Sequence, residues 1–489
     1  MRSHAPPARR CRALPPAAAV GLAVATLAGC QTYAPRPLDP AAHRAQWAAR
    51  SPDAAGVAEF ARRLAAPGEP APFDTSDGLS LAEAEAVALF FNPRLRVARL
   101  RAGVAAATAE NAGLWDDPTL DFDGERILAG VDHPWVVGAT IGLTIPISGS
   151  LSAERDRADA EHRAALARVA QDEWEVRSRL RAAWLEWSAH TLRAQQTREF
   201  LDELDAIAAV AARLEEAGEM PRTESRLFRL ERLARQGDLR LHDARARESE
   251  LALRALMGLT PDAQVALVPT LARPPVATPD SVLDEAIEAR SPVLAVLREE
   301  YAVAELTLRR EIREQYPDIT IGPGIGEEDG DSRAFLAVSL PIPLWNRNRQ
   351  GVAEAAAQRE LARAEYEAAV ESLAADLAAA AVRAEALAAQ RQEIESLLVP
   401  LVDEQDQEIT RLARLGEFDA LLTLETLVRR HETKLRLIDA RLEEALAAAR
   451  IEELLGPPPP PSAPAAADAD ADADADAPIT APPTGGSNP

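Results

Sequence analysis

Most of the chain follows the apolar spacing of long amphipathic helices. Residues 147–220 contain no proline, and about 66 of them are expected to form one helix, roughly 99 Å long at 1.5 Å per residue. The chain should then reverse at Gly218-Glu219-Met220-Pro221. A second helix of about 37 residues is expected to follow and to end at Gly258, a residue suited to that position.

Two short segments alternate instead with the period of a β-strand. The first segment runs from Thr119 to Asp123. In it, Leu120 and Phe122 lie on one face and two aspartates lie on the other. In the second, the apolar face comprises Val137, Ala139, Ile141, Leu143 and Ile145, and the small or polar face comprises Val136, Gly138, Thr140, Gly142 and Thr144. Each strand is therefore expected to separate an apolar environment from a polar one.

This arrangement occurs twice along the chain. Landmark residues recur at offsets of 197 to 199 residues: Pro93 and Pro292, Pro118 and Pro317, Pro146 and Pro343, Gly218 and Gly416, Gly258 and Gly456. A constant offset indicates one structural unit used twice. Each unit should contain a helix (Leu79 to Trp115 in the first), two strands, one very long helix and one returning helix. In the second unit Pro400 should kink the long helix.

The N-terminal segment predicts export and lipidation. Arg9, Arg10 and Arg12 precede an apolar stretch that is typical of a secretory signal, and Leu27-Ala28-Gly29-Cys30 has the form of a bacterial lipobox. Cys30 is therefore expected to carry the lipid; an ordinary cleavage site beside a chance cysteine is the alternative. The predicted organisation is a signal peptide (1–29), an N-terminal arm (30–78), a first repeat (79–258), a linker (259–280), a second repeat (281–456) and a disordered Pro/Ala/Asp tail (457–489).

The charge of the chain narrows the classes of partner. The formal charge is −24, and removal of the four arginines in residues 1–29 gives −24 − 4 = −28. Such a chain should repel nucleic acid and anionic lipid surfaces, and a lumen lined by it would favour cations. The same surplus of acid also keeps long helices soluble, so both interpretations stay open.

Residues that carry chemistry are scarce. The predicted mature chain has no thiol left free, the methionines are Met1, Met220 and Met257, and the histidines show no paired ligand spacing. No Ser/His/Asp group, phosphate loop or paired carboxylate site stands out. We therefore expect no enzymatic activity, no cofactor and no metal centre.

The number of strands predicts an oligomer. An open sheet in lipid leaves backbone groups unpaired at its edges, and bacterial outer-membrane barrels start at about eight strands. Two copies of four strands would enclose a tight interior, whereas three copies leave room for an aqueous lumen. A homotrimer is therefore expected.

From residue 79 to 456 the chain resembles the TolC-like outer membrane efflux proteins. The resemblance is carried by Leu79-Ser80-Leu81, Glu83-Ala84, Asn92-Pro93, the proline-ended strands, the glycine-centred turns, Leu256-Met257-Gly258 and Leu454-Leu455-Gly456. The segment from Leu340 to Gly351, LPIPLWNRNRQG, looks like the CzcC-type branch, which works with inner-membrane cation-efflux pumps and periplasmic adaptors. The resemblance implies a mainly α fold with a small membrane β part, assembled as a trimeric β-barrel joined to a long α-helical barrel.

The resemblance also implies where the channel narrows. In the family, acidic residues shortly after the turn glycines narrow the periplasmic entrance. Here those residues are Glu224, Asp419 and Glu425; exposed acids on a helix surface are the alternative for each. The turn tips expected to contact the periplasmic adaptor protein are Gly218, Glu219, Gly416 and Glu417.

The sequence thus predicts a lipid-anchored channel subunit in the outer membrane that extends into the periplasm. It would be a passive exit duct for substrates delivered by an inner-membrane pump and a periplasmic adaptor, with metal cations as the favoured cargo. Two alternatives stay open. The channel could export organic compounds or a polypeptide, or the chain could be a lipid-tethered periplasmic coiled-coil scaffold without conductance.

Overall fold

The computed structural model describes residues 33–64, 73–128, 135–273, 285–328, 330–415 and 417–458. The chain divides into a short N-terminal unit that ends at Ala49 and a second unit that begins at Arg50. The N-terminal unit contains helix α2 (Pro40–Ala48). The carboxylate of Asp39 caps this helix by accepting hydrogen bonds from the backbone N–H groups of Ala41 and Ala42, at 3.0 and 2.9 Å.

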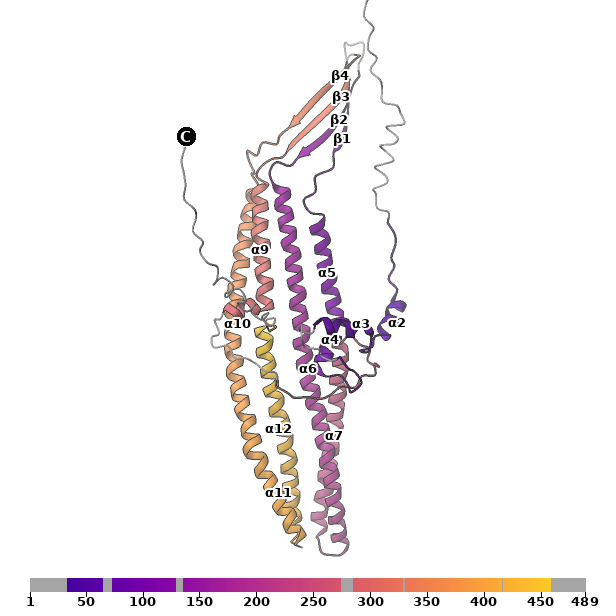
Figure 1. The fold of residues 1–489 in the computed structure, drawn as a ribbon, viewed down its shortest axis with the longest axis vertical. Helices are drawn as coiled ribbons and strands as arrows, with labels where there is room; N and C mark the ends of the chain where they lie inside the picture. The colour runs from indigo at the N-terminus through magenta and orange to yellow at the C-terminus, as the bar shows by residue number, and fades with distance from the viewer. Residues whose placement is uncertain are drawn as a thin grey trace, which may run out of the picture. The chain divides into compact units, whose positions relative to one another are not determined.

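The second unit follows the duplicated order that the sequence predicts (Figure 1). After α3 (Ala55–Leu64), the first repeat comprises α4 (Leu81–Phe91), α5 (Pro93–Glu110), β1 (Thr119–Arg126), β2 (Trp135–Ile145), α6 (Ser150–Glu216) and α7 (Arg222–Leu256). The second repeat comprises α8 (Glu285–Arg290), α9 (Pro292–Arg313), β3 (Ile319–Glu328), β4 (Asp331–Ser339), α10 (Arg349–Glu393), the π-helical turn η1 (Ile394–Leu398), α11 (Val399–Arg414) and α12 (Ala420–Leu455).

Helix α6 is the longest element. It has 67 residues, so it is about 100 Å long. Along its length it packs against α5 and α9 towards one end and against α7 and α12 towards the other. Ion pairs join it to these neighbours, for example Arg163 with Glu299 of α9 and Arg193 with Asp439 of α12. The predicted long, proline-free helix is confirmed.

The first helical segment ends earlier than the sequence pattern suggested. It stops at Glu110 rather than Trp115. Asn111 closes it, donating its side-chain amide to the carbonyl of Ala107 at 2.8 Å. Gly113 then adopts a positive φ of 61°, and a side chain there would collide with the backbone of Leu151 in α6. Asn111 and the left-handed Gly113 therefore end the helix, and the glycine lets the chain pack closely on α6.

The proline in the second long helix is accommodated without breaking it. Residues 349–414 are helical throughout, and the π turn η1 lies directly before the turn that carries Pro400. A proline lacks an N–H and its ring crowds the carbonyl four residues earlier, which a wider π turn relieves. A π turn therefore lies just before Pro400, where a kink was predicted, and the helix continues past it.

The two repeats end in the same junction. Gly258 and Gly456 have φ values of 72° and 79°, and a side chain at either would collide with a backbone carbonyl, that of Phe91 or that of Arg290. Each of these carbonyls comes just before the capping residue of the next helix, Asn92 for α5 and Ser291 for α9. The recurrence of glycine at an offset of 198 residues therefore reflects a repeated close contact between helix ends.

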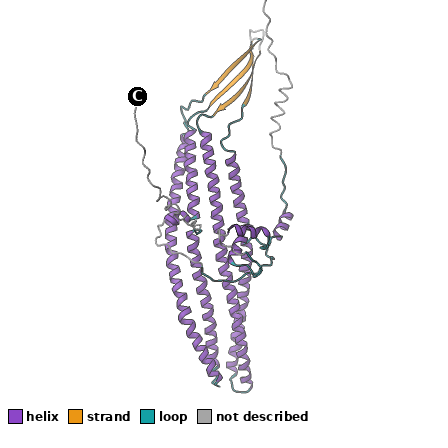
Figure 2. Cartoon of the chain, in the orientation of Figure 1, coloured by secondary structure: helices purple, strands orange, loops and turns teal. Residues whose placement is uncertain are grey.

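None of the helices in the described ranges has a stretch long and apolar enough to cross a membrane. The strands are confined to one end of the helices in the second unit, as Figure 2 shows.

Candidate functional site

The four strands form one antiparallel sheet in the order β1-β2-β3-β4. The middle pairing joins the two repeats, with Ala139 opposite Ile325 and Thr144 opposite Thr320. The hairpin residues 129–134 and 329 lie outside the described residues. Strand β4 runs from Asp331 to Ser339 and pairs with β3 up to the hairpin turn.

The sheet register places apolar side chains on one face across all four strands. Adjacent cross-strand partners on this face include Phe122, Ala139, Ile325 and Ala334 in one row. The large apolar residues of this face that remain exposed are Leu120, Phe122, Trp135, Val137, Ile141, Leu143, Ile325, Leu336 and Val338. A continuous exposed apolar surface of this kind marks an interaction site rather than an ordinary protein surface.

The opposite face carries mostly small and polar residues, with Phe335 as an aromatic exception. One of its rows contains Asp121, Thr140, Gly324 and Phe335, and another contains Thr144, Thr320 and Ser339. The hydroxyl groups of Thr144 and Thr320 lie 3.1 Å apart and form a hydrogen bond across the two repeats. This face suits contact with water, as in a barrel whose lumen is aqueous.

Both outer edges of the sheet are unpaired in the described chain. In the sheet order, β1 and β4 each have a neighbour on one side only. Unpaired strand edges expose rows of N–H and C=O groups, which further strands can satisfy. The sheet is therefore built to continue into additional strands on both sides.

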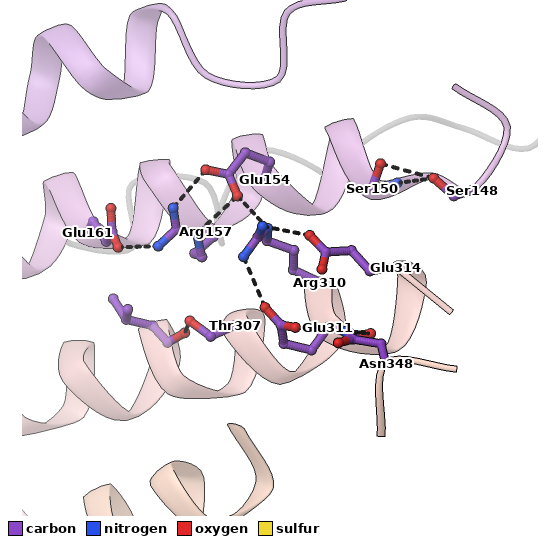
Figure 3. A network of polar contacts seen from close by, with 11 residues as sticks. Ser148, Ser150, Glu154, Arg157, Glu161, Thr307, Arg310, Glu311, Glu314 and Asn348 are labelled. Carbon is purple, nitrogen blue, oxygen red and sulfur yellow. Dashed lines mark hydrogen bonds and ion pairs between the residues drawn. The ribbon is translucent and has the colours of Figure 1, made fainter. Parts of the chain in front are cut away.

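An ion-pair network lies where the helices meet the sheet (Figure 3). Arg310 of α9 bridges to Glu154 of α6 at 2.9 Å and to Glu314 of its own helix at 2.6 Å. Arg157 also pairs with Glu154, at 2.7 Å, and holds the pKa of that carboxylate below its ordinary value. Burial raises the pKa of Glu314. The network joins α6 and α9 beneath the sheet.

Asn348 anchors the turn between β4 and α10 to this network. Its amide donates to the backbone carbonyl of Glu311 at 2.9 Å and to the Glu311 carboxylate at 2.7 Å. Arg347 and Asn348 both have φ of 49°, the only positive values among the described non-glycine residues. A side chain at Gly351 would collide with the Glu311 carboxylate. Asparagine tolerates the left-handed conformation better than most residues, so Asn348 close to Gly351 is a sequence signal of a tight turn.

The two helical hairpins reverse direction by the same hydrogen-bond pattern. The N–H of Glu219 donates to the carbonyl of Leu214 at 2.9 Å, and the N–H of Glu417 donates to that of Leu412 at 3.1 Å. Gly218 supplies a positive φ of 78°. The glutamates and Gly218 are exposed, whereas Gly416 lies outside the described residues. The structure thus places the predicted turn tips at equivalent positions of the two hairpins.

The predicted gate residues lie just beyond these turns. Glu224 is in the first turn of α7 and is half-buried, and Glu425 is exposed on α12. Asp419 has a structural task as well, because its carboxylate caps α12 by accepting from the N–H groups of Leu421 and Leu422, both at 3.0 Å. The structure of one chain brings none of the three carboxylates into contact with another. Cys30, the predicted lipidation site, lies outside the described residues.

The hairpins contact each other through an apolar cluster near the turns. It contains Phe200, Leu204, Ala211, Met220, Phe228, Ala420 and Leu427, from α6, α7 and α12 and the turn before α7. Beside it, the ring of His431 stacks on Phe200 with centroids 4.3 Å apart. His431 is 2% exposed, and neither ring nitrogen has a hydrogen-bond partner. Burial lowers its pKa to about 4.

Among the described residues, no group of three or more His, Cys, Asp or Glu side chains is arranged to hold a metal ion. The features that stand out are the two-faced sheet, its open edges and the long hairpins.

Comparisons with known proteins agree with this geometry. No family model matches the chain. The cobalt-zinc-cadmium resistance protein CzcC of Cupriavidus metallidurans is 25% identical over 324 residues, which cover 65% of this chain and 76% of that protein. The outer-membrane channel OprN has a TM-score of 0.65 at 16% identity, covering 80% of this chain and 94% of its own. CusC, described with transmembrane channel formation, has a TM-score of 0.63 at 15% identity, covering 80% and 98%.

The fold is therefore that of the TolC-like outer membrane channels, mainly helical with a small antiparallel sheet. The resemblance to the CzcC-type branch, drawn above from the segment after β4, is confirmed by the CzcC relative.

Proposed function

We propose that the chain is one subunit of an outer-membrane efflux channel, a passive duct that substrates leave through. The observation that carries the proposal is the sheet with one apolar face, one polar face and two open edges. In a bilayer the apolar face meets lipid and the polar face lines water. The open edges are satisfied only when several copies join their strands.

Three copies form the channel, because three sheets enclose a lumen that two would fill. The helices extend from the sheet into the periplasm, where α6 alone is about 100 Å long. Cys30 carries the lipid that anchors the chain in the outer membrane. The hairpin tips meet a periplasmic adaptor, which links the duct to an inner-membrane pump. The chain performs no reaction of its own.

Metal cations are the cargo. The relative with cobalt-zinc-cadmium resistance in its name supports this choice, as does the formal charge of −24. The described residues hold no metal cluster, so the pump selects the cation and the duct passes it. Glu224, Asp419 and Glu425 narrow the periplasmic entrance, where carboxylates from three chains attract cations. Organic compounds are the alternative cargo.

The proposal is tested with the full-length protein purified from outer membranes. A trimer by native mass measurement that conducts ions in a planar bilayer is the expected result. A monomer that is water-soluble once its lipid is removed would favour the periplasmic scaffold instead. Cargo is tested separately, by the zinc, cobalt and cadmium tolerance of cells with and without the gene; unchanged tolerance to all three would exclude metal export.

A further inference from the structure

The segment after β4 continues the apolar face of the sheet beyond the last strand pair. The final pairing joins Ser339 to Thr320, yet the apolar alternation Leu336, Val338, Leu340 is extended by Ile342 and Leu344. These added side chains are 72% and 62% exposed, and the adjacent Trp345 is 76% exposed. The described chain thus leaves an unpartnered apolar strip at the boundary between sheet and helices.

The backbone of this strip needs few hydrogen-bond partners. Pro341 and Pro343 have no N–H, and the N–H of Leu344 donates to the carbonyl of Ile342 at 2.9 Å. A backbone that has lost its strand partner is costly in an apolar environment unless its donors are removed or satisfied. The prolines therefore suit the segment to a place at the edge of a bilayer.

Two arginines, Arg347 and Arg349, lie two and four residues after the tryptophan. The side chain of Arg347 folds back, its Nε donating to the carbonyl of Pro343 at 3.1 Å. Both Arg347 and Arg349 are exposed, and neither has an ion-pair partner within the described chain. The Asn348 contacts to Glu311 hold this turn against α9, so the segment is presented by a fixed frame.

The corresponding segment of the first repeat lacks these features. After Pro146 it reads Ile147-Ser148-Gly149 and enters α6 at once, without an aromatic or basic residue. The N–H of Ser148 is satisfied by Asp318 at 3.0 Å. The aromatic and the arginines are thus an addition to the second repeat, and the turn that both repeats need can be made without them.

We propose that the strip from Leu340 to Arg349 docks on the phospholipid headgroup layer of the leaflet that faces the helices, and so fixes the depth of the channel in the membrane. Trp345 lies at the boundary between acyl chains and headgroups, where amphipathic aromatic side chains are favoured. Arg347 and Arg349 bind the lipid phosphates, complementing their negative charge. This inference rests on the proposed membrane-spanning sheet, whose apolar face the strip continues.

The position of Trp345 is tested by fluorescence quenching. Full-length protein is reconstituted in phosphatidylethanolamine and phosphatidylglycerol vesicles that contain lipids brominated either near the headgroup or near the bilayer centre. The fluorescence quenching that is lost in Trp345→Phe should be the quenching caused by the bromines near the headgroup. Trp174, buried in the helices and donating to Glu453 at 2.9 Å, provides the matched control: Trp174→Phe should leave lipid quenching unchanged.

Trp135, at the end of β2 far from the helices, distinguishes failure of this inference from failure of the proposed function. Quenching at Trp135 without quenching at Trp345 would overturn this inference and leave the membrane sheet intact; a weaker trimer in Trp345→Phe would then assign the strip to a neighbouring copy. Absence of quenching at both would overturn the proposed function as well.

The role of the two arginines is tested by measuring how much phosphatidylglycerol stays bound to the protein. Arg347→Gln with Arg349→Gln should weaken phosphatidylglycerol binding about five-fold per arginine in native mass measurements. Arg363→Gln with Arg383→Gln, exposed on α10, should have no effect. Equal losses in the two double variants would show that the strip does not bind lipid phosphate.

Discussion

His431 offers a sharp test of how the two hairpins are held together. The ring lies between α12 and α6, buried against Phe200, with both nitrogens unpartnered. The charged and titratable groups that face it are Arg235, Asp238 and His242 of α7 and Lys434 of α12. Burial lowers its pKa most, Arg235 adds to this, and Asp238 opposes it. A neutral ring is therefore part of the folded state.

The sign of the pH dependence follows from these values. The pKa is lowered from 6.5 to about 4, so between these pH values the unfolded chain binds a proton that the folded chain does not. Stability from this residue is fully present above 6.5 and is lost as the pH falls through the folded pKa. The gap between the two pKa values corresponds to about 3 kcal/mol per chain.

The perturbation is His431→Leu, which fills a similar volume without a titratable group. At neutral pH the variant should be as stable as the wild type or about 1 kcal/mol more stable, since two unsatisfied nitrogens are removed. The assay is thermal unfolding of detergent-solubilised protein, followed by tryptophan fluorescence from about pH 7 to about pH 4. The variant should lose markedly less stability on acidification. Some loss should remain, because burial also lowers the pKa of His190 and His242.

His43→Leu is the matched control, because His43 is exposed on α2. If His431→Leu loses as much stability as the wild type over this range, the reasoning from its burial is wrong.

Three further predictions concern other parts of the chain. Cys30→Ser should abolish lipidation, so the intact mass should lack acyl chains; a wild-type mature protein without acyl chains would refute the assignment. Asp419→Asn with Glu425→Ala should reduce cation selectivity in single-channel recordings with asymmetric salt. Asparagine is chosen at position 419 because it keeps the cap on α12, whereas alanine would lose the cap and about 1 kcal/mol of stability. Unchanged selectivity would identify both residues as surface acids. Asn348→Ala should destabilise the junction by about 1–3 kcal/mol, since it removes both hydrogen bonds from Asn348 to Glu311; an unchanged unfolding midpoint would contradict this.

The strand faces and the long helix were predictable because both depend on local periodicity. The alternation in β2 assigns each side chain to a face whatever its partner strand is, and the register of the sheet then confirmed those faces. Likewise, a stretch without proline or glycine can continue as a helix for 67 residues, and it does. The repeat was visible because the same helix-end contact requires glycine at Gly258 and Gly456.

The remaining features depend on contacts between residues far apart in the sequence. Gly113 lies so close to the backbone of Leu151 in α6 that a side chain there would collide with it, and only the packed structure shows this contact. Nothing local distinguishes His431 from an exposed histidine, and only the approach of Phe200 buries it. The motif after β4 was recognisable in the sequence, but its role appeared only when Asn348 was seen to anchor on Glu311. Sequence thus determined the elements and their faces, which local backbone and side-chain preferences set; tertiary structure decided where elements end and which polar groups are buried, because those depend on what packs against them.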